Sequence, residues 1–303
     1  MKRYYFEDVD NCEMCGDETS GHKVLGQRLS QSTGHFPRRK TGITVSVKRC
    51  NRCGLVYAAP LPIPFDMQDH YGIPPDSYWR PEYFRTDDDY FLGEIREAKP
   101  LLNFQPGMTA LDVGAGLGKA MITLDREGFS AFGLEPSRPF YEKAISEMGI
   151  STTRLRMGAI EELDYQPESF DFITFGAVFE HLYHPAQSLA TTLKWLKPGG
   201  IIHIEVPSGN WLIGRLINLF YRLQGTNYVT NLSPMHVPFH LYEFSLDSFR
   251  EAGRRLGFSV VSHRFEVCDL SPLPSWMHPV FRKIMKATDT GMQLTVYIKK
   301  SAQ

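Results

Sequence analysis

Four of the five cysteines stand in two Cys-x-x-Cys pairs, a pattern typical of metal binding. The x-x spacing lets both thiolates of a pair reach one ion at about 2.3 Å, and two pairs supply the four ligands of a tetrahedral zinc site. A redox-active pair is the alternative, but such a pair normally begins a helix within a βαβ unit, which neither surrounding sequence predicts. Four thiolates also leave no coordination position for catalysis. We therefore expect a structural Zn²⁺ held by Cys12, Cys15, Cys50 and Cys53.

A glycine-rich stretch, Leu111–Gly118, is the second feature typical of a ligand site. It joins a predicted strand, Thr109–Gly114, to a predicted helix, Gly118–Arg126. Ligands of open α/β sheets bind at the carboxyl ends of the strands, and glycines there let a ligand contact the backbone. The pattern differs from the dinucleotide-binding GxGxxG, because Lys119 occupies the third glycine position. Glu135 ends the next predicted strand, where a carboxylate can accept both hydroxyls of a ribose.

A third feature, the pair Glu180-His181, is suited to moving a proton. It follows another predicted strand, Phe170–Phe175, and histidine is the usual general base at neutral pH. The alternative is that the pair only packs or forms hydrogen bonds beside a ligand. His240 is a further candidate, either for a substrate contact or for anchoring its own loop. His181, His236 and His240 together would suit a metal ion, but their spacing is not diagnostic.

The elements that must position these residues alternate between strand and helix from residue 108 onward. Such alternation predicts a parallel sheet with helices on both faces, so the glycine-rich stretch and the Glu180-His181 pair lie on loops at one edge of that sheet. The predicted strands are 109–114, 131–135, 170–175 and 201–206, and the predicted helices are 118–126, 138–148 and 185–196.

Composition places the chain among globular proteins. With 303 residues, 42% hydrophobic and 22% charged, it is long enough for one large or two smaller domains. A net charge of −1 makes a protein dedicated to nucleic acid unexpected, because such proteins are usually strongly basic. No apolar run reaches the ~18 residues of a membrane span, and the first residues lack the apolar segment of a signal peptide. We expect a cytoplasmic protein, in a compartment where thiols stay reduced.

The first 105 residues have two distinct compositions. Gly21–Tyr57 contains eight Lys or Arg and no acid, which indicates either a solvated face that balances a zinc–thiolate centre or a phosphate contact. Residues 61–105 are rich in proline and aromatic side chains, which either pack the small domain onto the large one or cap a ligand site. The aromatic residues of this segment include Tyr71, Tyr78, Trp79, Tyr83, Phe84, Tyr90 and Phe91.

Together these features resemble class I S-adenosylmethionine-dependent methyltransferases over about residues 106–300. Phe170-Asp171, Glu180-His181-Leu182 and Leu196–Gly200 agree with that family as well. The resemblance implies an α/β fold with a doubly wound, seven-stranded Rossmann-like core, in which the last strand, Gln293–Ile298, is antiparallel and pairs with Phe258–Ser262. It implies S-adenosylmethionine as the cofactor. The cofactor-binding residues that it implies are Asp112, Gly114, Ala115, Gly116, Gly118, Glu135, Pro136, Ala159, Ile160 and Phe175.

The cysteine head, Cys53–Tyr57 and His240–Ser245 extend the match. With them the chain is similar to the zinc-ribbon methyltransferases of sugar and natural-product biosynthesis, including deoxysugar C-methyltransferases. In that group the Glu-His pair takes part in proton abstraction, which implies that the catalytic residues are His181, Glu180 and His240.

One position departs from the family pattern. Ala159 stands where an adenine-contacting Asp is usual, so adenine recognition would fall to the Ile160 backbone or to Glu161 or Glu162.

The expected domains are a zinc-ribbon-like domain (1–60), an aromatic and proline-rich linker and cap (61–105), and a methyltransferase domain (106–303) with an insertion at about 208–240. Two segments, Trp211–Phe220 and Trp276–Met285, have helical apolar spacing with basic residues beside it. Each is interpreted as a helix packed on the core, a substrate lid or a membrane-surface helix.

The sequence therefore predicts an enzyme that methylates carbon or oxygen of a small biosynthetic intermediate: a sugar, a sugar nucleotide or a natural-product acceptor. A lipid-linked acceptor is one alternative, and RNA held by the zinc head and the basic loop is another. The expected partner is a small molecule, with nucleic acid disfavoured. A cofactor-binding module without catalysis is the remaining alternative, and the oligomeric state is left open.

Overall fold

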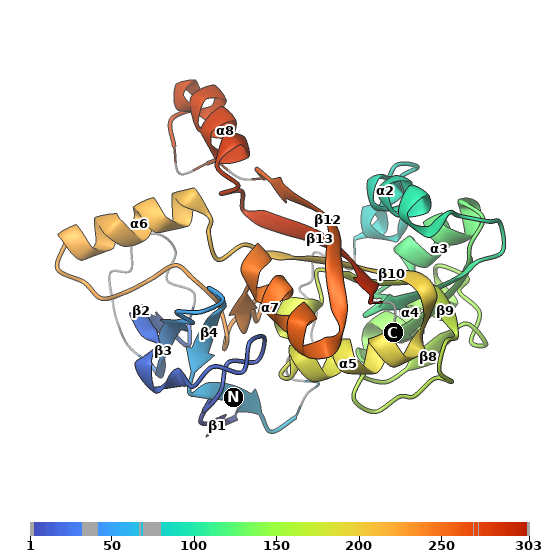
Figure 1. Ribbon diagram of the computed structural model, residues 1–303, viewed down its shortest axis with the longest axis horizontal. Helices are drawn as coiled ribbons and strands as arrows, with labels where there is room; N and C mark the ends of the chain where they lie inside the picture. Colours follow the sequence, from blue (N-terminus) through green and yellow to red (C-terminus); the bar gives the residue numbers. More distant parts are fainter. Residues whose placement is uncertain are drawn as a thin grey trace.

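The computed structural model describes residues 3–31, 42–66, 68, 80–268, 270–271 and 273–301 (Figure 1). Tyr71, Tyr78 and Trp79 of the predicted linker lie outside the described residues.

The larger sheet has seven strands, as predicted. All of them run parallel except β13, which is antiparallel to both of its neighbours. The chain order reverses between β6 and β9, and the carboxyl ends at such a reversal form a ligand crevice. Across the sheet the strands are β12 (Phe258–Glu266), β13 (Gln293–Lys300), β10 (Leu196–Pro207), β9 (Phe170–Gly176), β6 (Thr109–Val113), β7 (Ser130–Glu135) and β8 (Leu155–Met157).

Helices cover both faces of this sheet, and the central strands alternate their side chains between two apolar clusters. Along β6, Ala110 joins one cluster while Leu111 and Val113 join the other. The Ala110 cluster contains residues of α2 (Leu92–Leu102), α3 (Lys119–Arg126) and α4 (Arg138–Ser146). The opposite cluster contains residues of α5 (Pro185–Trp195) and α7 (Leu246–Leu256), together with the four paired cysteines of the head.

One predicted turn is part of a strand. The sequence Lys197–Gly200 predicts a turn before a strand, but β10 begins at Leu196. Its register against β9 shifts between Leu196 and Ile201, and Gly199 has a φ of +82°. A bulge of this kind accommodates a left-handed glycine without ending the strand.

The head contains a four-stranded sheet that is completed by a distant part of the chain. Its strands, in spatial order, are β11 (Tyr242–Glu243), β4 (Val56–Ala59), β3 (Thr44–Arg49) and β2 (Lys23–Leu29). A separate two-stranded ribbon pairs β1 (Tyr4–Glu7) with β5 (Leu61–Pro64).

Two basic residues of the head, Arg28 and Arg49, lie between the head and the inserted segment. The Arg28 guanidinium is buried and donates to the Tyr228 hydroxyl (2.8 Å) and the Val229 carbonyl (3.1 Å). Arg49 donates to the Asn210 side chain (2.9 Å) and to the Gly209 carbonyl. The sequence allowed two interpretations of this basic stretch, a solvated face or a phosphate contact. Arg28 and Arg49 have neither role, because they form hydrogen bonds between the head and the insertion.

Two further helices extend away from the large sheet, α6 (Leu212–Leu223) and α8 (His278–Ala287) (Figure 1). Buried apolar residues hold them to the body, Ile213 and Tyr221 in α6 and Met285 in α8. Among the described residues, no helix combines the length and apolar character that crossing a bilayer requires.

Candidate functional site

The glycine loop after β6 is held against the end of β7. Gly114 and Ala115 both donate their backbone N–H to the Leu134 carbonyl at 2.9 Å. Gly114 has a φ of +72°, and a Cβ there would lie 2.6 Å from a Val178 methyl, so only glycine fits. Gly116 also has a positive φ, +55°, but no atom lies within 4 Å of the place where its Cβ would stand. The loop therefore leaves open space beside Gly116, where a ligand can contact the backbone.

Glu135 links the loop to the next helix. One carboxylate oxygen accepts the Gly116 N–H at 2.7 Å, and the other accepts the Ser137 N–H at 2.7 Å. The side chain is buried, and burial raises the pKa of Glu135 to about 7 despite these two donors. Each oxygen keeps a lone pair for a further hydrogen bond.

Asp112, at the end of β6, is a second buried acid beside the loop. Burial and the nearby Glu135 raise the pKa of Asp112 to about 8. Tyr90 is close enough that burial and the Asp112 charge raise its pKa to about 12. Two buried carboxyls favour a positively charged ligand, and the ammonium group of S-adenosylmethionine carries such a charge. The residues present thus fit the predicted cofactor.

A cavity of about 300 Å³ adjoins the loop. Four predicted cofactor residues line it, namely Gly114, Pro136, Ala159 and Ile160. Its other lining residues from the large domain are Val113, Leu134, Glu161, Glu162, Val178, Leu182, Tyr183 and His184.

The other predicted cofactor residues lie outside this lining. Among the described residues, Asp112, Ala115, Gly116, Gly118, Glu135 and Phe175 are not part of the lining. Phe175 is fully buried and packs against Phe179 with ring centroids 5.4 Å apart. It therefore supports the site from within the hydrophobic core.

Three cavity-lining residues come from the β1–β5 ribbon: Tyr5 and Glu7 of β1 and Ile63 of β5. Sequence reasoning missed them because their place in the site depends on how the head packs on the large domain. No local motif marks them.

The candidate catalytic residues lie together. Glu180 Oε1 is 3.6 Å from His240 Nε2 and 3.9 Å from His181 Nε2. His181 Nδ1 is 3.2 Å from the Phe239 carbonyl, which accepts a hydrogen bond when Nδ1 is protonated and leaves Nε2 unprotonated. Glu180 is buried, and its Oε2 finds no hydrogen-bond partner among the described residues.

Burial keeps this cluster neutral near pH 7. It lowers the pKa of His181 to about 4 and that of His240 to about 3. It also raises the pKa of Glu180 to about 8. Neutral imidazoles can accept a proton or bind a metal, and one ligand atom from each of the three residues lies within 4.8 Å of the others. His236, which the sequence groups with the other two histidines, is not part of this set.

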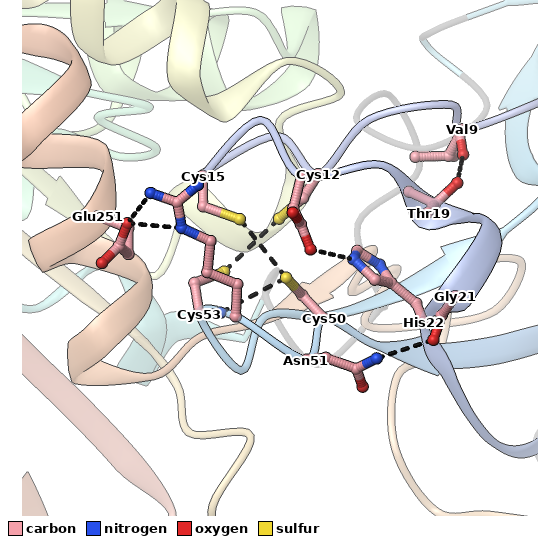
Figure 2. A network of polar contacts seen from close by, with 12 residues as sticks. Val9, Cys12, Cys15, Thr19, Gly21, His22, Cys50, Asn51, Cys53 and Glu251 are labelled. Carbon is pink, nitrogen blue, oxygen red and sulfur yellow. Dashed lines mark hydrogen bonds and ion pairs between the residues drawn. The ribbon is translucent and has the colours of Figure 1, made fainter.

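The four paired cysteines converge in the head (Figure 2). Cys12 and Cys53 have their sulfurs 3.5 Å apart, as do Cys15 and Cys50, and none forms a disulfide. A tetrahedral zinc with bonds of about 2.3 Å needs sulfurs about 3.8 Å apart. Burial raises the pKa of Cys15 to about 12, so ionising all four thiols would require a bound cation. The arrangement is compatible with zinc.

The cysteine cluster is attached to α7 of the large domain. Ser245, the residue before α7, donates its hydroxyl to the Cys53 carbonyl at 2.6 Å. Arg255 donates to the carbonyls of Glu13 and Met14 at 2.9 and 3.0 Å.

The described part of the linker contacts the start of α3, next to the glycine loop. The Lys119 ammonium, at the start of α3, lies 4.4 Å from the Tyr83 ring centroid and 5.8 Å from that of Tyr90.

Comparison with known proteins shows methyltransferase relatives. Residues 84–263, more than half of the chain, match a family model described as a methyltransferase domain. A ubiquinone biosynthesis O-methyltransferase of Bradyrhizobium sp. is 32% identical over 118 residues, 38% of this chain and 46% of that protein. A tRNA U34 carboxymethyltransferase of Desulfotalea psychrophila is 27% identical over 139 residues, 45% of this chain and 40% of that protein. The chain thus spans about half the length of the curated relatives it matches.

A solved structure agrees in fold. A SAM-dependent methyltransferase from Archaeoglobus fulgidus has a TM-score of 0.50 and 18% identity, and the match covers 75% of this chain and 100% of that chain. The Rossmann-like fold with its mixed seven-stranded sheet is therefore that of a methyltransferase. The chain belongs to the methyltransferase-domain family.

Proposed function

We propose that this enzyme methylates oxygen or carbon of a small biosynthetic intermediate, such as a sugar, a sugar nucleotide or a natural-product acceptor. The observation that carries the proposal is the cluster of Glu180, His181 and His240, whose neutral imidazoles can accept the proton that an oxygen or carbon acceptor loses. The two internal arginines of the head, Arg28 and Arg49, are engaged with the insertion, which disfavours an RNA acceptor.

The cofactor is assigned to the residues around the loop. Asp112 and the open backbone at Gly116 would bind the methionine part, and the lone pairs left on Glu135 would accept the ribose hydroxyls. Pro136 and Ile160 would contact adenine. Glu161 and Glu162 also line the cavity, so either can replace the usual Asp that is Ala159 here.

His181 is the proposed general base. When bound, S-adenosylmethionine supplies a methyl group activated by its sulfonium. The acceptor loses a proton as its oxygen or carbon bonds to the methyl, and His181 Nε2 takes that proton. The Phe239 carbonyl holds Nδ1–H, which keeps Nε2 available. Orientation of acceptor and methyl in line supplies most of the rate.

Zinc, bound by the four cysteines, is proposed to stabilise the head. Cys12 follows β1, and Cys53 precedes β4 and β5. An ion there would fix the chain on both sides of the β1–β5 ribbon, and with it one wall of the cavity.

Labelled methyl transfer tests the acceptor class. The enzyme is incubated with methyl-labelled S-adenosylmethionine and, separately, with a small-molecule extract and with total RNA. We expect label in the small-molecule fraction. Label in RNA, with RNA binding that weakens steeply as salt rises, would refute the proposal.

A matched pair of variants tests the cavity. Glu7→Ala should weaken S-adenosylhomocysteine binding, because Glu7 lines the cavity that also contains Pro136 and Ile160. Phe6→Ala is the control, since successive side chains of a strand point to opposite sides. Equal effects of the two variants would remove Glu7 from the cofactor site.

A further inference from the structure

Helix α6 carries exposed apolar side chains that the cofactor site does not use. They are spaced at i, i+3, i+4 and i+7, which places them along one stripe of the helix. Leu223 is 80% exposed and Leu219 is 52% exposed. The stripe consists of Leu216, Leu219, Phe220 and Leu223.

A second stripe lies on α8 and the turn before it. Trp276, Val280 and Ile284 follow one another every four residues, so they share one side of the helix. Trp276 is 77% exposed and Val280 is 60% exposed. A large exposed tryptophan is uncommon on a soluble surface without a partner.

These stripes are separate from the residues that hold the helices in place. Ile213 of α6 and Met285 of α8 are buried in one apolar cluster with Val267 and Leu270, which makes the two helices neighbours (Figure 1). Core packing therefore accounts for Ile213 and Met285 but leaves the exposed stripes unexplained.

Only cations accompany the stripes. α6 contains Arg215 and Arg222, and α8 contains Arg282, Lys283 and Lys286, all of them exposed. Neither helix contains Asp or Glu. Arg222 donates to the Leu25 carbonyl (3.1 Å) and Arg282 to the Val267 carbonyl (2.9 Å), so both are held to the body. We call the two stripes and the other three cations, Arg215, Lys283 and Lys286, the basic-apolar face.

We propose that the basic-apolar face binds the surface of a bilayer that contains anionic lipids. Leucine, phenylalanine and tryptophan would enter the boundary between headgroups and acyl chains, while arginine and lysine contact anionic headgroups. A second copy of the chain fits poorly, because a symmetric contact would bring these cations against one another. Nucleic acid would pair with the cations but would leave the leucine stripe in water.

Vesicle flotation of the full chain tests the proposal. The probes are vesicles of phosphatidylcholine alone and vesicles with about a third phosphatidylglycerol. We expect binding to the anionic vesicles that weakens as salt rises. Lys283→Glu/Lys286→Glu should weaken it by about twenty-fivefold or more, because each cation lost near such a surface costs roughly fivefold. Lys194→Glu, an exposed lysine of α5, is the matched control and should bind like the wild type.

A depth measurement supplies a second readout. Brominated acyl chains should quench the fluorescence of Trp276, and Trp276→Phe should remove most of that quenching while binding is retained. Three results would overturn the proposal. One is no binding to anionic vesicles at low salt, and another is equal, salt-insensitive binding to phosphatidylcholine alone. The third is a dimer in solution that Leu219→Ser/Leu223→Ser disrupts while vesicle binding is absent.

Discussion

The raised pKa of Glu135 predicts that cofactor affinity depends on pH. The carboxyl has a pKa of about 7 in the ligand-free protein, because burial outweighs the two backbone donors. If the ionised form accepts the ribose hydroxyls, nine tenths of the protein is competent at about pH 8 and one tenth at about pH 6. Affinity should therefore fall about tenfold over that interval, or about 1.4 kcal/mol.

Glu135→Gln isolates this effect. Glutamine does not titrate, so the part of the pH dependence that belongs to residue 135 should vanish. In the wild type the Glu135 carboxylate accepts both the Gly116 N–H and the Ser137 N–H. Glutamine has only one side-chain oxygen, so its NH₂ group must face one of these two donors. One buried donor is then left unpaired, which costs about 1–3 kcal/mol. The variant should bind more weakly than wild type at pH 8 and differ less from it at pH 6.

Calorimetry with S-adenosylhomocysteine measures both quantities. Titrations at several pH values, in two buffers of different ionisation enthalpy, give the affinity and the number of protons released. Asp112, with a pKa of about 8, contributes its own pH dependence, and Glu135→Gln should move that contribution to lower pH, because the Glu135 charge helps to raise the Asp112 pKa. A wild-type affinity that stays flat between pH 6 and pH 8, or an unchanged slope in the variant, would refute the reasoning.

Three further predictions use the rest of the site. Purified protein should hold about one zinc per chain by metal analysis, and Cys12→Ser should lose it; stable zinc-free wild type would contradict this. His181→Ala should lower turnover by ~10²–10⁴ while cofactor affinity is kept, and a rate within a few-fold of wild type would exclude the base role. With the pKa of His181 at about 4, the wild-type rate should fall only below about pH 5. Thermal melts of the ligand-free protein should show that stability falls as pH rises from about 6.5 to about 8. The reason is that Asp112 and Glu135 still hold protons in the folded state over this interval, whereas both carboxyls are already ionised in the unfolded chain. Stability that rises with pH over this interval would mean that neither carboxyl is protonated in the fold.

Local patterns predicted four strands of the large sheet, and the family resemblance supplied the rest. The apolar run before Gly114 and the acid that ends β7 follow from the pattern of residues, whereas the total of seven strands and the antiparallel β13 follow from the known order of the family. The converging cysteines were predictable as well, since their spacing alone limits the geometry.

The contacts between the head and the large domain were not predictable. β11 is only two residues long, too short for any periodic signal, yet it pairs with β4 from almost two hundred residues earlier. Arg28 and Arg49 have the composition of a solvated basic face, and only the position of the insertion shows that they are internal. The roles of Tyr5 and Glu7 in the cavity depend on the same packing.

The order of strands in the head also has a consequence for synthesis on the ribosome. β2, β3 and β4 emerge early, and the two cysteine pairs are complete once Cys53 has left the exit tunnel. The sheet nevertheless keeps an unpaired edge along β4 until Glu243 is translated, because β11 is the strand that covers it. The β4 edge of the nascent head therefore stays unpaired through most of translation, whereas β1 and β5 can pair as soon as Pro64 has been synthesised. Early metal capture would hold the growing chain together during that interval.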